Sequence, residues 1–216
     1  MKISCHPLIP LPIVAAFFSG LTVQFALFVC VLLWHELFHY IAARLMKISI
    51  HAVHFLPFGL TMVVSKSLTP PEEMILAIAG PLANLIACIV LWLAHWTRFE
   101  AGMFLCVLNF AFMCINLLPA LPLDGGRFLL AWWSRKGRVS AYHRMLYLHK
   151  WVTSFCFIGG VAMMLLMQWN VTLLAIAIFL LAHLQNIKQE IEYVKLQDAV
   201  EKYQIIVDNS GKNIVT

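Results

Sequence analysis

The sequence predicts an all-α integral membrane protein with six transmembrane helices and a small re-entrant β-hairpin after the second helix. Composition is the first observation behind this: 62% of the 216 residues are hydrophobic and only 12% are charged, about half of the roughly 25% charge found in soluble domains. Long uncharged stretches between the charged segments are the second. Backbone polar groups in a bilayer must be paired within helices or a closed barrel. A water-soluble enzyme is excluded.

The first two spans share one uncharged stretch. Residues 3–34 contain no Lys, Arg, Asp or Glu, which is more than the about 20 residues that one crossing needs. Gly20, with Ser19 and Thr22 beside it, predicts a turn within this stretch. We therefore expect a short first span at about residues 8–20 and a second at about 22–45.

Four further spans follow from the same pattern. Residues 74–97 and 101–123 are uncharged and of suitable length, so they are expected to form the third and fourth spans. Residues 151–187 are also uncharged but too long for one crossing, and Gln168-Trp169-Asn170 within them predicts an interfacial turn between the fifth and sixth spans. Residues 1–187 then form one six-span membrane domain. Residues 188–216 are expected to be a cytosolic tail, helical at first and then strand-like.

The distribution of cationic residues predicts the topology. An even number of spans places both termini on one side, and nearly all loop cations lie on that side, so both termini are expected to be cytosolic. The net charge of +5 is thus a topology signal, and no nucleic-acid partner is needed to explain it. The six cysteines show no C-x-x-C spacing and predict neither a disulfide framework nor a cysteine metal site. The cations on the cytosolic side are Arg44, Lys47, Lys66, Arg127, Arg135, Lys136, Arg138, Arg144 and Lys150, with Arg98 opposite.

The second span carries a cluster of ionisable side chains. Such groups are costly inside a membrane and indicate a functional site by default. His35 and His39 are four residues apart and share one helical face, while Glu36 lies one position along. Two imidazoles at this spacing bind Zn²⁺, and the glutamate acts as a general base on water.

A third metal ligand is expected from Asp124. It is the other formal charge at membrane depth, and it follows a segment that Pro119 and Pro122 prevent from being helical. Irregular backbone at this depth is tolerated where it lines a cavity in the protein. The alternative is an ordinary turn aspartate at the end of a helix.

Residues 48–64 predict the hairpin. They are rich in β-branched residues, fold about a Pro57-Phe58-Gly59 turn and directly follow the metal-binding span. We expect a re-entrant hairpin whose edge accepts an extended substrate strand. The alternative is a cytosolic loop at the membrane surface. His51 and His54 are interpreted as interfacial polar residues.

Two motifs together resemble the site-2 protease family of intramembrane zinc metalloproteases, peptidase family M50, and in particular its sporulation members. One is His-Glu-x-x-His at residues 35–39, and the other is Asn-x-x-Pro-x-x-Pro-Leu-Asp-Gly-Gly-Arg at residues 116–127. The resemblance implies zinc held by His35, His39 and Asp124, with Glu36 as general base and acid. It places Asn116 near the scissile bond of the substrate, for which an interhelical hydrogen bond is the alternative role.

The segment Ala79-Gly80-Pro81-Leu82-Ala83-Asn84 is similar to the family's Gly-Pro-x-x-Asn motif. We assign Asn84 to helix packing, because small residues beside it form a surface along which helices approach one another. Phe38 departs from the family, which most often has glycine before the second histidine, so packing behind the metal must be arranged differently here.

The resemblance also implies partners and location. The substrate would be a membrane-associated sporulation sigma-factor precursor, and inhibitory membrane proteins would control access to the site. The protein would lie in the cell membrane or the membrane around a developing spore. Residues 188–216 would be the linker to a nucleotide-sensing regulatory domain of the cystathionine-β-synthase type, or a tail without one.

Two other classes of protein are alternatives to a metalloprotease. A catalytically inactive scaffold would lack one of the four site residues, whereas His35, Glu36, His39 and Asp124 are all present. A histidine-box membrane oxygenase would need several histidine pairs for two irons, and the spans hold one such pair.

Overall fold

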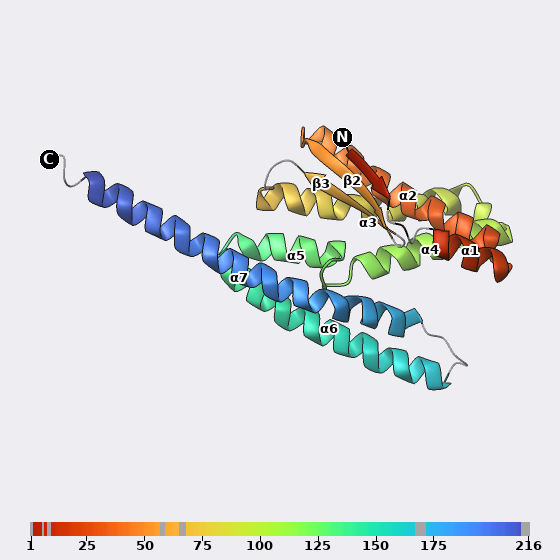
Figure 1. Ribbon diagram of the computed structural model, residues 1–216. Coiled ribbons are helices and arrows are strands. Elements are labelled where there is room, and N and C mark those ends of the chain that lie inside the picture. Colours follow the sequence, from red (N-terminus) through yellow and green to blue (C-terminus); the bar gives the residue numbers. More distant parts are fainter. Residues whose placement is uncertain are drawn as a thin grey trace. The chain divides into compact units, whose positions relative to one another are not determined.

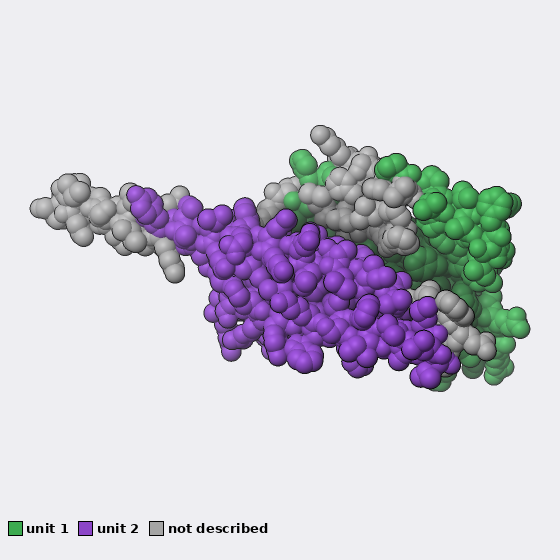
Figure 2. Space-filling model, turned by 60° about the horizontal axis from the view of Figure 1, so that its bottom comes forward, with its two compact units in different colours: residues 1–118, 123–128 green, residues 119–122, 129–216 purple. Residues whose placement is uncertain are grey.

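A computed structural model describes the chain in two compact units. Unit 1 comprises residues 1–118 and 123–128, and unit 2 comprises residues 119–122 and 129–216 (Figure 2). The described residues are 2–5, 7, 10–56, 59–64, 68–166 and 172–212.

Helices dominate both units, as the composition predicts (Figure 1). Unit 1 also contains three strands and a short 3₁₀ helix, and α5 begins in it. Unit 2 is built on two long helices. The elements of unit 1 are β1 (Lys2–Cys5), α1 (Pro10–Phe18), α2 (Thr22–Leu45), β2 (Ile50–Leu56), β3 (Gly59–Val64), α3 (Pro70–Leu93), η1 (Trp96–Arg98) and α4 (Glu100–Asn116); they are followed by α5 (Asp124–Ser134), α6 (Arg138–Leu166) and α7 (Thr172–Lys212).

The ends of α2 and α3 have clear local causes. Lys47, just beyond the last residue of α2, adopts a left-handed φ of 56°, through which the helix cannot continue. Thr69 caps α3, because its backbone N–H and its hydroxyl both donate to the Glu72 carboxylate over 2.8 Å. Thr69 and Glu72 form a capping box, and Pro70 occupies the first helical position, where its missing N–H costs nothing.

The strands form one sheet in the order β1-β2-β3. β2 and β3 are antiparallel, with Phe55 opposite Leu60, and they lie where the hairpin was predicted. The predicted turn at Pro57-Phe58 lies outside the described residues. β1 pairs in parallel with β2, placing Lys2 opposite Ala52. The sequence did not reveal β1, because a parallel partner distant in the chain leaves no local signal.

A small apolar cluster joins the sheet to the helices that hold the site. Ala43 near the end of α2, Ile48 and Leu76 of α3 are each 1–4% exposed, and Ile50 and Val64 of the hairpin pack against them. This cluster fixes the C-terminal end of α2 against the N-terminal end of α3.

Among the described residues, α2, α3 and α6 are long and apolar enough to cross a membrane, while α4 is apolar but has only 17 residues. Several expected bounds need correction. α3 begins and ends four residues earlier than the third predicted span, and α4 ends at Asn116 rather than at Leu123, because Pro119 and Pro122 follow. The predicted turn at Gln168-Trp169-Asn170 lies outside the described residues. The count of six spans stays a prediction.

Unit 2 corrects two further expectations. α6 begins at Arg138 rather than near Trp151. α7 is one helix to Lys212, so the expected strand-like segment of the tail is helical, and no break marks residue 188. Ile187, Ile191 and Val194 recur at helical spacing and all three are buried, which explains why α7 continues without a break past residue 188.

Candidate metal centre

The two histidines of α2 form the first part of the site. His35 and His39 are only 2% and 4% exposed, and their Nε2 atoms lie 3.0 Å apart. Because residues four apart lie one above the other on a helix, one face of α2 presents both rings to the same point.

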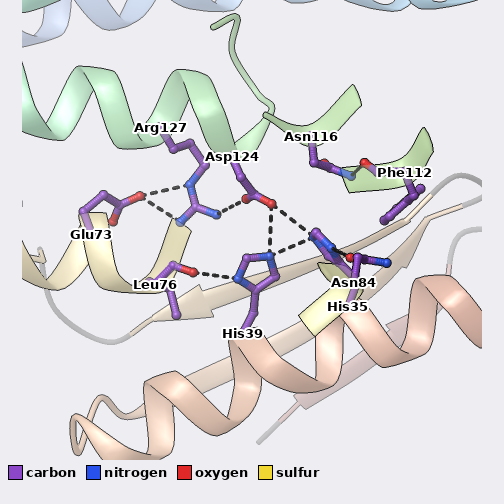
Figure 3. Close-up of polar contacts among 9 residues, drawn as sticks. All are labelled: His35, His39, Glu73, Leu76, Asn84, Phe112, Asn116, Asp124 and Arg127. Carbon is purple, nitrogen blue, oxygen red and sulfur yellow. Dashed lines mark hydrogen bonds and ion pairs between the residues drawn. The ribbon is translucent and has the colours of Figure 1, made fainter. Parts of the chain in front are cut away.

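Asp124 completes the group from the first residue of α5. Its Oδ2 atom lies 3.1 Å from Nε2 of His35 and 3.2 Å from Nε2 of His39 (Figure 3). The carboxylate is 6% exposed. Within the part of the chain that the structure describes, these are the three side chains of metal-ligating type that meet closely enough to hold one metal ion.

The dimensions of the group fit zinc. Tetrahedral zinc with bonds of about 2.0–2.1 Å places neighbouring ligand atoms roughly 3.3 Å apart. The three ligand atoms here are separated by 3.0, 3.1 and 3.2 Å. These separations are only slightly shorter than the tetrahedral value, so the ligand atoms can move apart to accept a metal ion without rearrangement of the helices.

The outward nitrogens of the imidazoles show which atoms are left for the metal. Nδ1 of His39 donates to the carbonyl oxygen of Leu76 over 2.7 Å, and Nδ1 of His35 donates to Oδ1 of Asn84 over 2.6 Å. In a neutral ring the other nitrogen, Nε2, then has a bare lone pair. Two lone pairs and a carboxylate oxygen converge, an arrangement that a cation stabilises.

Gly80 of α3 provides the space for this cation. A Cβ atom at Gly80 would run into the Nε2 atoms of both His35 and His39. The glycine therefore leaves open the place where the three ligand atoms point. The sequence predicts only a packing role for the small residues of this segment; the position of Gly80 in the site follows from the approach of α3 to α2.

Asn84 requires a correction. The sequence suggests a packing role, but Asn84 is fully buried and accepts the hydrogen bond from His35. Its own Nδ2 donates to Oδ1 of Asn109 on α4 over 2.9 Å. A signal was present in the sequence, because Asn84 lies one helical turn beyond Gly80 and so shares its face.

Arg127 lies beside the Asp124 carboxylate, next to the oxygen that does not face the histidines. Its Nε and Nη2 atoms donate to Oε1 of Glu73 over 3.0 and 2.7 Å, and its Nη1 lies 3.7 Å from Oδ1 of Asp124 (Figure 3). Oδ2 of Asp124 is thereby left to face the histidines. Glu73 was missed in the sequence, where nothing connects it with Arg127.

The remaining predicted residues lie near the group but are not members of it. Glu36 follows His35 on α2 and is half-buried. Asn116, the last residue of α4, donates from Nδ2 to the carbonyl oxygen of Phe112 over 3.0 Å. Phe38, the departure from the family motif, packs its ring 4.9 Å from that of Trp34, so the close approach to the metal group is made by Gly80 instead.

Comparison with known proteins adds independent support. The profile of peptidase family M50 matches residues 23–100, which include both histidines, Gly80 and Asn84. The solved structure of a site-2 protease from Methanocaldococcus jannaschii superimposes with a TM-score of 0.67 at 26% sequence identity, over 86% of this chain and 91% of that one. The chain therefore resembles the site-2 protease family in both sequence and fold.

Two relatives extend this result. Stage IV sporulation protein FB of Bacillus subtilis (strain 168) is 26% identical over 211 residues, which cover 94% of this chain and 72% of that protein. A zinc metalloprotease of Methanocaldococcus jannaschii is 37% identical over 117 residues, 51% of this chain and 34% of the relative. The match to this second relative thus covers about a third of its length. The family resemblance inferred from the two motifs is confirmed.

Proposed function

We propose that this chain is a zinc-dependent intramembrane endopeptidase that hydrolyses a peptide bond of a membrane-associated protein near the cytosolic side. The observation that carries the proposal is the convergence of His35, His39 and Asp124, with ligand atoms 3.0–3.2 Å apart in a buried site. The M50 family match and the relative named as a zinc metalloprotease support the same reaction class.

Each site residue then has a distinct role. His35, His39 and Asp124 hold zinc, which when bound supplies Lewis-acid activation of a water molecule and of the scissile carbonyl. Glu36, next to His35 on α2, takes the proton from the attacking water and passes it to the departing amide nitrogen. Proton transfer of this kind contributes about 10²–10⁴-fold to a rate.

The substrate has to be unwound before its carbonyl groups are accessible, because a transmembrane helix pairs them internally. We propose that the hairpin is re-entrant and that the released strand adds to β3. Within the described residues β3 pairs with β2 alone, while β1 occupies the other edge of β2, so β3 is an edge strand suited to this addition. Asn116 would contact the same strand through its Oδ1 atom.

The likeness to stage IV sporulation protein FB over 94% of this chain supports a specific substrate. We propose a sporulation sigma-factor precursor at the cell membrane or the membrane around a developing spore, with inhibitory membrane proteins as further partners. In this proposal residues 1–187 form a six-span membrane domain with cytosolic termini, and residues 188–216 form a cytosolic tail.

Co-expression with a candidate sigma-factor precursor tests the proposal. The wild-type chain is compared with Glu36→Gln, and Glu190→Gln, an exposed glutamate of α7, is the matched control. Zinc is measured in all three. Processing by the wild type and the control but not by Glu36→Gln, at equal zinc content, supports the hydrolytic role. Equal processing in all three contradicts it, and zinc without processing in any indicates an inactive scaffold for this precursor.

A further inference from the structure

A chain of hydrogen bonds runs from the metal group across three helices. Nδ1 of His35 on α2 lies 2.6 Å from Oδ1 of Asn84 on α3, and Nδ2 of Asn84 donates to Oδ1 of Asn109 on α4 over 2.9 Å. Nδ2 of Asn109 donates to the carbonyl oxygen of Leu105 over 2.8 Å. The three side chains are at most 4% exposed, so water does not compete for these bonds.

The direction of this chain is fixed at its far end. A backbone carbonyl oxygen only accepts hydrogen bonds, so Asn109 must turn its amide nitrogen toward Leu105 and its oxygen toward Asn84. Asn84 must then present its nitrogen to Asn109 and its oxygen to His35. As a result, Nδ1 of His35 carries the ring hydrogen.

This direction matters because a neutral imidazole has two tautomers. With the hydrogen on Nδ1, Nε2 keeps the lone pair that a metal needs; with the hydrogen on Nε2, His35 is no ligand at that atom. For His39 the choice is made directly by the carbonyl oxygen of Leu76, 2.7 Å from Nδ1. His35 faces a side-chain amide instead, and an amide is nearly the same shape when turned over.

Asn109 removes this freedom. If Asn84 turned over, its oxygen would face Oδ1 of Asn109. If Asn109 turned over as well, its oxygen would face the carbonyl oxygen of Leu105 across 2.8 Å. Either reversal leaves buried acceptors opposed and unpaired, at a cost of about 1–3 kcal/mol for each unsatisfied group.

We propose that Asn109 is a positioning residue that, through Asn84, sets the tautomer of His35 and keeps its Nε2 available for the metal. This rests on the proposed metal-binding role of His35. Asn109 is linked to His35 through Asn84, so it acts from two hydrogen bonds away.

The test measures Co²⁺ binding by the full chain in detergent, from the cobalt absorption spectrum and by competition with zinc. Asn109→Leu is expected to lower metal affinity by about 10-fold, the lower end of the effect for groups that orient metal ligands. Cys88→Ala is the matched control. It removes a contact between the same two helices, from Sγ of Cys88 to the carbonyl oxygen of Cys106 at 3.4 Å, and is expected to leave affinity unchanged.

A rescue separates positioning from packing. An ionised carboxylate at position 84 only accepts, so Asn84→Asp fixes the tautomer of His35 without help from Asn109. The double variant Asn84→Asp/Asn109→Leu is expected to bind Co²⁺ as tightly as Asn84→Asp alone. A further 10-fold loss in the double variant would mean that Asn109 acts by packing, which overturns the proposal.

A second variant covers the case in which Asn109→Leu does not fold. Asn109→Asp places a carboxyl group at a buried position without a cation partner, where the neutral form is favoured; its O–H donates to the carbonyl oxygen of Leu105 and its other oxygen accepts from Asn84, so it is expected to retain affinity within about threefold. Wild-type affinity in a folded Asn109→Leu, or a 10-fold loss in Asn109→Asp, overturns the positioning role while leaving the proposed function intact. Absence of Co²⁺ binding in the wild type would instead overturn the proposed function, and this inference with it.

Discussion

Nδ1 of His39 lies 2.7 Å from the carbonyl oxygen of Leu76. Since that oxygen can only accept, the ring hydrogen of His39 is held on Nδ1 and Nε2 is turned toward Asp124. The partner is a main-chain atom of α3, so no side-chain replacement at Leu76 removes the bond. The orientation of this ligand depends on how closely α3 approaches α2, and Gly80 permits that approach.

Gly80→Ala is therefore expected to abolish metal binding while the chain still folds. The new methyl group would collide with Nε2 of both His35 and His39, whereas alanine is the better helix former by about 0.5–1 kcal/mol. Zinc per protein and thermal unfolding of the purified variant check this. Gly159→Ala is the control, because its Cβ would meet only Leu173 at an ordinary 3.7 Å. Full zinc content in Gly80→Ala would show that α3 does not border the metal.

Glu36→Gln is expected to keep zinc and lose at least 100-fold in proteolysis. The amide is nearly the same size as the carboxylate but accepts no proton, so the general-base contribution of about 10²–10⁴-fold disappears. Product formation against time, with zinc measured in the same preparation, checks both parts. Loss of zinc together with activity would instead place Glu36 among the metal ligands.

Asp124→Asn is expected to weaken the metal site more than any substitution of a group that only orients a ligand, hence by more than about 100-fold. Asparagine keeps an oxygen but loses the negative charge that lies 3.1 and 3.2 Å from the two histidines. Competition with a chromogenic chelator measures the affinity. Affinity equal to that of the wild type would remove Asp124 from the ligand set.

Arg127→Lys is expected to lower zinc affinity by about 10-fold, at the lower end of the effect for residues that support a ligand. A lysine cannot reproduce the two bonds of 3.0 and 2.7 Å to Glu73 while remaining beside Asp124. The same chelator competition provides the measurement. Lys195→Met, which breaks the exposed pair with Glu192 at 2.9 Å, is expected to change nothing, and an equal loss in both variants would point to a general effect of removing charge.

The central residues of the candidate site were predictable from sequence because their signals are local. The spacing of His35 and His39 places both on one helical face, and Pro119 and Pro122 predict the helix break before Asp124. The chemistry expected of an aspartate at such a break agrees with its position 3.1 Å from His35.

The residues that support the metal group were harder to predict from the sequence. Asn109 and Glu73 act through partners on other helices, and no spacing rule connects them with Asn84 or Arg127. The contact of β1 with β2 is equally remote in sequence. In the tail, charges alternating with Ile, Val and Tyr suggested a strand after a helix, but α7 is helical to Lys212, and Ile187, Ile191 and Val194 are buried at helical intervals along it.

The separation of Asp124 from His39, 85 positions along the chain, has a consequence for biogenesis. During synthesis at about 5–20 residues per second, roughly 4–17 s pass between the appearance of the second imidazole and that of the carboxylate. Throughout that interval the nascent chain offers a metal ion only two ligand atoms, the Nε2 atoms of His35 and His39. Stable loading must therefore await translation through α5, when the last helix to contribute a ligand joins the ones already inserted.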